Sequence, residues 1–302
     1  MGRNAHTVAM TAPARPEREW GRYETLLATI DENVLNIALN RPRRLNAFVR
    51  TMRDDLLDAF KRAGEDDEVR VVIVSGSGMA FCIGMDLEAG PSTFDVRDRV
   101  GIDDFRDEGG EVVLAIFECP KPVLGAIHGA AVGVGATMTL PMDVRIASDD
   151  ARFGFVFTRR GVTLESCSSW FLPRIVGVSK ALEWTLTGRV FTAAEALEGG
   201  LVSRVVPRAD LLEETRKLAR EIADNTSAVS VALCRRMVWT MLGADHPRVA
   251  HLVDSRGMYC MGSSPDAAEG IESLLQKRPP NFRMKVSRDV PSEVFDDLPR
   301  KR

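Results

Sequence analysis

The chain has 302 residues, of which 45% are hydrophobic and 27% are charged, and its formal net charge is −3. This length and apolar content can bury a full-sized core and predict a soluble globular protein with one large domain and an accessory segment. The 40 basic and 43 acidic residues are spread along the chain, without the basic excess that phosphate backbones select. The balance argues against nucleic acid as a main partner.

The cysteines and the N-terminal residues argue against secretion and membrane insertion. The cysteines are odd in number, widely spaced and outside any CxxC or zinc-type pattern, so reduced thiols in a cytoplasmic protein fit best and no metal site is predicted. Residues 1–20 contain no apolar stretch that could form a signal-peptide core and are expected to be a disordered leader. No segment approaches the roughly 20 uninterrupted apolar residues of a membrane-spanning helix, so no membrane partner is expected.

Strand and helix patterns alternate along the first part of the chain. Residues 25–30 and 34–40 are β-rich runs separated by Asp-Glu-Asn, which predicts an edge hairpin. Apolar residues then recur at helical spacing over 52–60, and residues 69–74 and 122–127 are mostly apolar runs typical of strands buried on both faces. Strands that alternate with helices indicate α/β layering.

The second part of the chain is expected to be mainly helical. Residues 86–110 are acidic and weakly periodic, which predicts a mobile loop before a helix that begins near Glu111. After a core over residues 21–206, helices follow without strands at 209–223, 228–241, 247–261 and 266–276. They define a helical C-terminal oligomerisation region over 207–282. The polar, proline-bearing residues 283–302 are expected to be an extended tail.

Two glycine-bearing segments, 80–87 and 128–135, each follow a predicted buried strand. Either segment alone is most simply a tight turn that needs positive φ. Two backbone amides that converge on one point, however, form an oxyanion hole, which stabilises charge that develops on a thioester carbonyl oxygen; loss of one donor typically costs about 3 kcal/mol. The second segment also opens a helix, whose N-terminal dipole favours that charge.

A series of motifs resembles the signatures of the crotonase (enoyl-CoA hydratase/isomerase) superfamily in order and spacing. They are Asn40-Arg41-Pro42 with Leu45-Asn46-Ala47, Ala80-Phe81-x-x-Gly84-x-Asp86-Leu87, Pro122 to Gly135 with Asp143, Phe153-Gly154 with Gly161 and Leu172-Pro173-Arg174, and Leu186-Thr187-Gly188-Arg189 through Glu198-x-Gly200-Leu201-Val202. The resemblance implies an α/β fold, a crotonase-type spiral of ββα turns with a helical C-terminal trimerisation region. It also implies an acyl-CoA substrate, no cofactor beyond the coenzyme A of that substrate, and a homotrimer or a hexamer.

By the same resemblance, the oxyanion donors are the backbone amides of Met85 and Val134. Val134 replaces the usual middle glycine, which narrows the pocket and requires compatible backbone angles. Pro141 is expected to shorten or kink the helix that follows. The positions implied to bind coenzyme A or the acyl group are Arg44, Leu45, Asn46, Ala80, Gly84, Asp86, Leu87, Gly133, Thr137, Phe157 and Lys277. Solvated surface charges are an equally good interpretation of Arg44 and Lys277.

The carboxylates indicate which reaction to expect. The hydratases that the chain resembles use two glutamates, one to activate water and one to deliver a proton. Thr137 and Phe157 occupy those two positions, and neither can act as a base. Glu165 lies where Δ3-Δ2-enoyl-CoA isomerases of the peroxisomal type carry their single catalytic acid. Without that context it would be interpreted as a glutamate that favours a helix N-terminus; with it, Glu165 is predicted to be catalytic.

One carboxylate suffices for a double-bond shift, because the same base removes the α-proton of a 3-enoyl thioester and returns it at the γ-carbon. Aromatic residues near Glu165 in sequence are expected to raise its pKa, namely Phe155, Phe157, Trp170 and Phe171. His128 and Cys167 are more simply structural. Two alternatives stay open: a hydratase or related lyase that recruits Glu165 or an acidic residue of the 86–111 segment, and a non-catalytic acyl-CoA-binding homologue.

Overall fold

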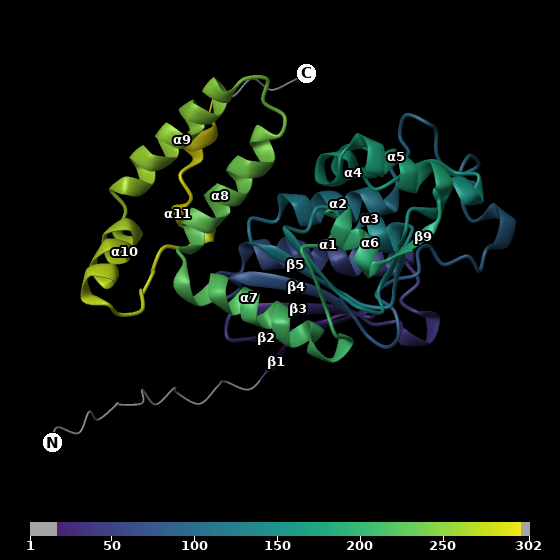
Figure 1. Cartoon of the computed structure of the whole chain (residues 1–302), viewed down its shortest axis with the longest axis horizontal. Coiled ribbons are helices and arrows are strands. Elements are labelled where there is room, and N and C mark those ends of the chain that lie inside the picture. Colours follow the sequence, from purple (N-terminus) through teal and green to yellow (C-terminus); the bar gives the residue numbers. More distant parts are fainter. Residues whose placement is uncertain (1–16, 297–302) are drawn as a thin grey trace.

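The computed structural model describes residues 17–296, which form a seven-stranded sheet and a three-stranded sheet with flanking helices (Figure 1). The large sheet has the order β1-β2-β3-β4-β5-β7-β10. Its strands are β1 (Arg18–Arg22), β2 (Leu26–Asp31), β3 (Val34–Leu39), β4 (Val71–Gly76), β5 (Val123–Ile127), β7 (Val144–Ser148) and β10 (Arg204–Val206). The β2–β3 pair is the predicted antiparallel hairpin, and the strands from β3 onward pair in parallel. The predicted α/β class is confirmed.

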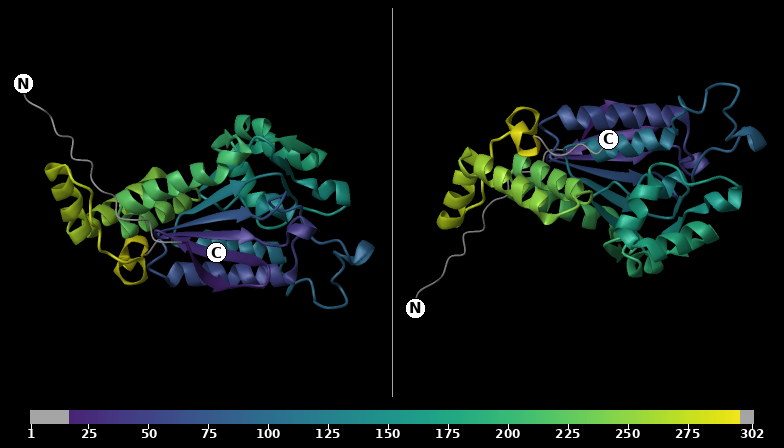
Figure 2. Two further views of the ribbon diagram at one scale, coloured as in Figure 1. Left: turned by 90° about the horizontal axis from the view of Figure 1, so that it is seen from below. Right: turned by 90° about the horizontal axis from the view of Figure 1, so that it is seen from above.

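Helices cover both faces of the large sheet (Figure 2), and alternate residues of its central strands pack in different clusters. On one face Val72 and Val74 of β4 pack in the core shared with α1 (Arg50–Glu65) and α2 (Glu108–Glu118). On the other face Val71 and Ile73 pack in a separate cluster with α7 (Leu211–Asn225). Because successive side chains of a strand point to opposite faces, a continuous apolar run is the pattern of a strand covered on both sides. The α7 helix therefore packs on the sheet, although the predicted core ended at residue 206.

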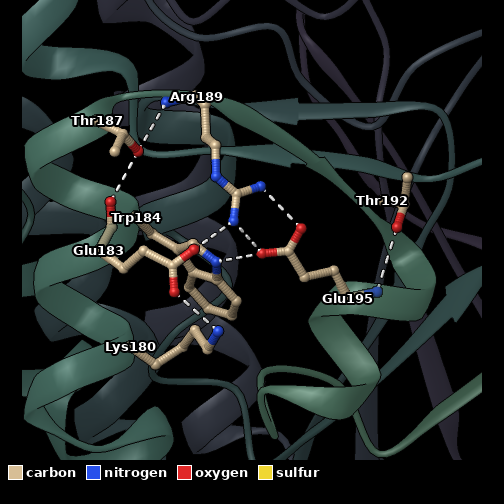
Figure 3. A network of polar contacts seen from close by, with 7 residues as sticks. All are labelled: Lys180, Glu183, Trp184, Thr187, Arg189, Thr192 and Glu195. Carbon is tan, nitrogen blue, oxygen red and sulfur yellow. Dashed lines mark hydrogen bonds and ion pairs between the residues drawn. The ribbon is translucent and has the colours of Figure 1, made fainter.

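The small sheet and several short helices form the layer around the glycine-bearing segments. The small sheet contains β6 (Ala130–Val132), β8 (Arg152–Gly154) and β9 (Val190–Thr192), and the helices are α3 (Val134–Thr137), α4 (Ser168–Val176), α5 (Val178–Thr187) and α6 (Ala193–Glu198). The α3 helix ends before Pro141, in line with its predicted effect. A polar network fastens α5 to α6: the Arg189 guanidinium pairs with Glu183 and Glu195, and the Trp184 indole N–H donates to Glu195 at 2.8 Å (Figure 3).

Three C-terminal helices extend away from the sheet at one end of the molecule (Figures 1 and 2). They are α8 (Ala228–Met241), α9 (Pro247–Gly262) and α10 (Pro265–Gln276), and all three predicted helices are confirmed. The expectation of an extended tail from residue 283 is wrong for its described part. Two short helical turns, α11 (Val286–Asp289) and η5 (Ser292–Phe295), follow, and Val294 and Phe295 are buried in the cluster that α8 and α9 form.

The start of the described chain also differs from the prediction. The β1 strand begins at Arg18, inside the expected 1–20 leader, and pairs with β2. Trp20 anchors it, because its indole N–H donates to Asp66 at 2.8 Å and the Arg62 guanidinium stacks 4.5 Å from its ring centre. Leader residues 1–16 lie outside the described part of the chain. All five cysteines carry free thiols, and no helix within residues 17–296 is long and apolar enough to cross a membrane.

Candidate active site

The two glycine-bearing segments lie side by side. The Cys82 amide donates to the Ala130 carbonyl at 2.9 Å, and the Val132 amide donates to the Cys82 carbonyl at 3.0 Å. Gly84 and Gly133 both adopt positive φ, at 101° and 56°. A Cβ atom on Gly133 would lie 3.7 Å from the Gly84 Cα atom, so the two turns are in direct contact. Glycine is required here because L side chains disfavour these backbone angles.

The two amides predicted as oxyanion donors follow these glycines directly. Within residues 17–296, neither the Met85 nor the Val134 amide donates to a backbone or side-chain acceptor. Val134 is the first residue of α3, where an amide has no partner inside the helix and carries the positive end of the dipole. Val134 keeps a negative φ because Gly133 before it takes the positive one, so the backbone accommodates the valine.

The Glu165 carboxylate contacts the same short helix. The Thr137 hydroxyl of α3 donates to Glu165 Oε1 at 2.6 Å, and the Ser166 hydroxyl donates to Oε2. The first turn of α2 closes the other side: a Cβ atom on Gly109 would lie 2.5 Å from Glu165 Oε2 and 2.9 Å from Val134 Cγ2. A single carboxylate is thus packed against the helix turn that begins with the predicted oxyanion donor.

Burial raises the pKa of Glu165 to about 7, and the negative charge of Asp107 adds to the rise. The two hydroxyl donors, Ser166 and Thr137, stabilise the ionised form and lower the pKa, but by less than burial raises it. A carboxyl group with a pKa near 7 can both accept and return a proton at neutral pH. This combination of burial, specific donors and proximity to free backbone amides is typical of a catalytic acid/base.

The predicted motif residues around Arg44 form a structural ion-pair cluster. Arg44 pairs with Glu88 and lies 3.6 Å from Asp86, and Asp86 also accepts from Arg41 at 3.1 Å. Leu45 and Leu87 flank the cluster and are exposed. The ion pairs hold the 3-10 turn η1 (Pro42–Arg44) against the residues that follow Met85.

Asn46 has a different role from the one expected. It is fully buried; its Oδ1 accepts from the Arg41 amide at 2.8 Å, and its Nδ2 donates to the carbonyls of Ser77 and Ala80 at 2.9 and 2.8 Å. With both side-chain N–H groups used and no exposed surface, Asn46 braces the turn. Asn46 thus has no free N–H group and no exposed surface to offer a substrate, whereas the binding role of Ala80, whose carbonyl accepts from Asn46, stays a prediction.

Phe157 and Lys277 complete the set of predicted positions. Phe157 is buried in the 3-10 turn η3 (Val156–Arg160), at the second hydratase glutamate position. Lys277 caps the C-terminal end of α10, which lies remote from α3 (Figure 1). The structure therefore does not bring Lys277 to the site of its own chain.

Three residues beside the candidate base were not predicted from the sequence, namely Asp107, Gly109 and Ser166. Asp107 accepts the amide of Gly110 at 2.6 Å as the N-cap of α2 and the amide of Ser166 at 2.9 Å. This cap makes α2 begin at Glu108, ahead of the predicted start near Glu111. An aspartate three residues before a helical amide is a recognisable N-cap signal, but no local pattern places Gly109 and Ser166 beside each other.

Comparisons with known proteins agree on one family. The enoyl-CoA hydratase/isomerase family model matches residues 29–285. An enoyl-CoA hydratase of Alternaria alternata is 39% identical over 253 residues, which cover 83% of each chain. The 1,2-epoxyphenylacetyl-CoA isomerase of Escherichia coli is 30% identical over 274 residues, covering 86% of this chain and 98% of that protein. A crystal structure of an enoyl-CoA hydratase from Mycobacterium smegmatis matches with a TM-score of 0.76 at 31% identity, covering 86% of this chain and 99% of that one.

Proposed function

Because the chain belongs to the enoyl-CoA hydratase/isomerase family and is an enzyme of the crotonase superfamily, we propose that it isomerises a 3-enoyl-CoA thioester to the 2-enoyl-CoA, with Glu165 as sole acid/base. One observation carries the proposal: Glu165 is half-buried and accepts a hydrogen bond from α3, while Thr137 and Phe157 stand at the positions that hold two glutamates in the hydratases the chain resembles. A double-bond shift needs one carboxylate, and hydration by the usual pair needs two.

The proposed mechanism moves one proton between two carbons. Ionised Glu165 removes a proton from the α-carbon of the 3-enoyl thioester, and the electron pair spreads over the double bond and the carbonyl to give a dienolate. The dienolate oxygen accepts hydrogen bonds from the amides of Met85 and Val134, which have no other acceptor within residues 17–296. Neutral Glu165 then protonates the γ-carbon, which yields the conjugated thioester and restores the carboxylate.

Hydration is the second candidate, because several relatives are named enoyl-CoA hydratases. In that case Glu165, or an acidic residue of the 86–111 segment, would activate water. Asp107 is the residue of this segment whose charge acts on Glu165, but its Oδ1 already accepts two backbone amides. That engagement favours a one-carboxylate reaction.

The experiment that separates the two functions uses both substrates. Purified enzyme is mixed with a 3-enoyl-CoA and, separately, with a 2-enoyl-CoA, and the absorbance of the conjugated thioester is followed. We expect absorbance to appear from the 3-enoyl substrate. Loss of absorbance from the 2-enoyl substrate, with no gain from the 3-enoyl substrate, would establish hydration in place of isomerisation.

The pH dependence follows from the raised pKa of Glu165. We expect kcat/KM for the 3-enoyl-CoA to rise with pH through a midpoint near 7, since only the ionised carboxylate accepts the α-proton. The same group should destabilise the fold at high pH: its folded-state pKa of about 7 exceeds the ordinary 4.5, so its full contribution to stability is present below pH 4.5 and is lost as the pH rises through 7. A kinetic midpoint near 4.5 would contradict this assignment.

Thr137→Val is expected to shift that kinetic midpoint to higher pH. The threonine hydroxyl donates to Glu165 Oε1 and lowers its pKa, so loss of this donor favours the neutral form. Thr137→Ser keeps a hydroxyl and is the matched control. The pH profiles of kcat/KM for wild type and both variants check the prediction; equal shifts in the two variants would exclude the hydrogen bond as the cause.

We also propose that the C-terminal helices mediate assembly into a homotrimer or hexamer. Large apolar side chains are exposed on α8, α9 and α10, namely Val238, Leu252, Met258, Tyr259, Ile271, Leu274 and Leu275. Exposed apolar patches of this kind mark interaction surfaces. Light scattering tests the proposal, with a 33.2 kDa species as the result that would refute it.

A further inference from the structure

A single carboxylate oxygen links helix α2 to the residue that follows Glu165. Oδ1 of Asp107 accepts the Gly110 amide at 2.6 Å, which caps α2, and the Ser166 amide at 2.9 Å. Two donors on one ionised oxygen are charge-assisted hydrogen bonds, which are stronger than neutral ones. Asp107 thus joins two segments that lie far apart in the chain.

The linked segment has an unusual backbone. Ser166 and Cys167 adopt φ values of 53° and 52°, in the left-handed region that L-residues rarely occupy. Bonds on both sides hold this conformation: Asp107 accepts the Ser166 amide, and the Ser168 amide and hydroxyl donate to the Glu165 carbonyl at 2.9 and 2.6 Å. A conformation of this kind persists only where its surroundings fix it.

The same segment sets the position of the Glu165 carboxylate. The Ser166 amide donates to Asp107, and the Ser166 hydroxyl donates to Glu165 Oε2. Ser166 therefore connects Asp107 to the carboxylate of Glu165. Gly109, two residues after Asp107, packs against Glu165 Oε2 and against Val134 of α3. Movement of Asp107 would therefore change both contacts of Oε2.

We propose that Asp107 is a positioning residue, whose Oδ1 holds the Ser166 backbone in the left-handed conformation that places the Glu165 carboxylate against α3. The inference rests on the proposed function, since it assigns a role relative to the base. Asp107 itself does not contact the reacting atoms.

The kinetic test compares Asp107→Ala with Asp107→Asn. Asparagine keeps an acceptor oxygen at Oδ1, whereas alanine removes it. We expect Asp107→Ala to lower kcat about 100-fold with KM changed less than about 3-fold, because misplacement of a catalytic group by about 1 Å has that effect; Asp107→Asn should retain most of kcat. Thr192 is the N-cap of α6, and its hydroxyl accepts a hydrogen bond from the Glu195 amide (Figure 3). Thr192→Ala removes this cap and is the control for the loss of a helix cap alone.

A pH profile measures the effect of the Asp107 charge on Glu165 separately from the positioning role of Oδ1. Asp107→Asn removes the negative charge that raises the pKa of Glu165, so the midpoint of kcat/KM should move to lower pH. The other titratable groups whose charges interact with Glu165 are the Cys82 and Cys167 thiols; burial raises the pKa of both and keeps them neutral. Equal losses in kcat for Asp107→Ala and Thr192→Ala would overturn the proposal.

A crystal structure of Asp107→Ala tests the proposal independently of the reaction. We expect Ser166 to leave the left-handed region and the 2.6 Å bond between Thr137 and Glu165 to be lost. An unchanged Ser166 backbone would overturn the role of Asp107 even if the enzyme isomerises 3-enoyl-CoA. Failure of the wild-type enzyme to convert that substrate would instead refute the proposed function, and the structure of the variant would still decide the role of Asp107.

Discussion

Replacement of Glu165 with glutamine is expected to lower kcat for 3-enoyl-CoA isomerisation by about 10³-fold or more, because general acid–base catalysis contributes about 10² to 10⁴ and here one group performs both proton transfers. Glutamine keeps the size of the side chain and can still accept from the Thr137 hydroxyl. Substrate binding should therefore change little, so the loss should fall on kcat. Continuous absorbance assays of the conjugated thioester measure the effect.

Two comparisons make this result specific. Glu198→Gln makes the same chemical change at an exposed position of α6 and should retain wild-type activity. Denaturant unfolding at pH 8 should show Glu165→Gln to be more stable than wild type, because the variant no longer holds an ionised carboxylate in a buried site. A Glu165→Gln enzyme with more than about a tenth of wild-type kcat would exclude Glu165 as the sole base.

The sequence predicted the elements whose signal is local. Continuous apolar runs marked β4 and β5, and helical periodicity marked α8, α9 and α10. The β1 strand was missed because Arg-Glu-Trp-Gly-Arg has no strand pattern of its own; it forms through pairing with β2 and the anchoring of Trp20. The packed tail was missed for the same reason, since the burial of Val294 and Phe295 depends on a surface that α8 and α9 create together.

The residues of the candidate site also divide into those that local motifs predict and those that only tertiary packing brings together. Glu165, Met85 and Val134 were predicted because short motifs carry their positions, and the structure places Glu165 against the helix that begins at Val134. Asp107 and Gly109 were not predicted, because their roles arise from contacts between α2 and the segment after Glu165. Such contacts depend on tertiary packing, which no local pattern in one sequence encodes.

Gly109→Ala is the prediction that tests this packing most directly. With the backbone unchanged, the added Cβ would clash with Ser166 Oγ and would lie 2.5 Å from Glu165 Oε2 and 2.9 Å from Val134 Cγ2. Ser166 Oγ and Glu165 Oε2 are ends of side chains that can rotate, so the fold can accept the methyl group by displacing the carboxylate. We expect kcat to fall about 100-fold, the loss that a misplacement of about 1 Å produces.

Stability should respond much less than activity. Overpacking lowers the free energy of unfolding by about 1 to 3 kcal/mol, whereas the replacement of glycine by alanine stabilises a helix by about 1 kcal/mol. The melting temperature should therefore fall by only a few degrees. Gly135→Ala is the contrasting case, because its Cβ would clash with the backbone carbonyl of Cys82, which cannot rotate away, and the variant should fold poorly. Gly262→Ala, with nothing within 4 Å of the added atom, should match wild type in both assays.

The outcome decides how the base is held. A folded Gly109→Ala enzyme with low kcat and nearly unchanged KM would mean that the first turn of α2 fixes the Glu165 carboxylate by contact, alongside the Asp107 link to Ser166. A folded variant with wild-type kcat would mean that contact with the bound substrate, and not with α2, positions the carboxylate. In that case the contacts with Ser166 and Gly109 would describe only the resting arrangement.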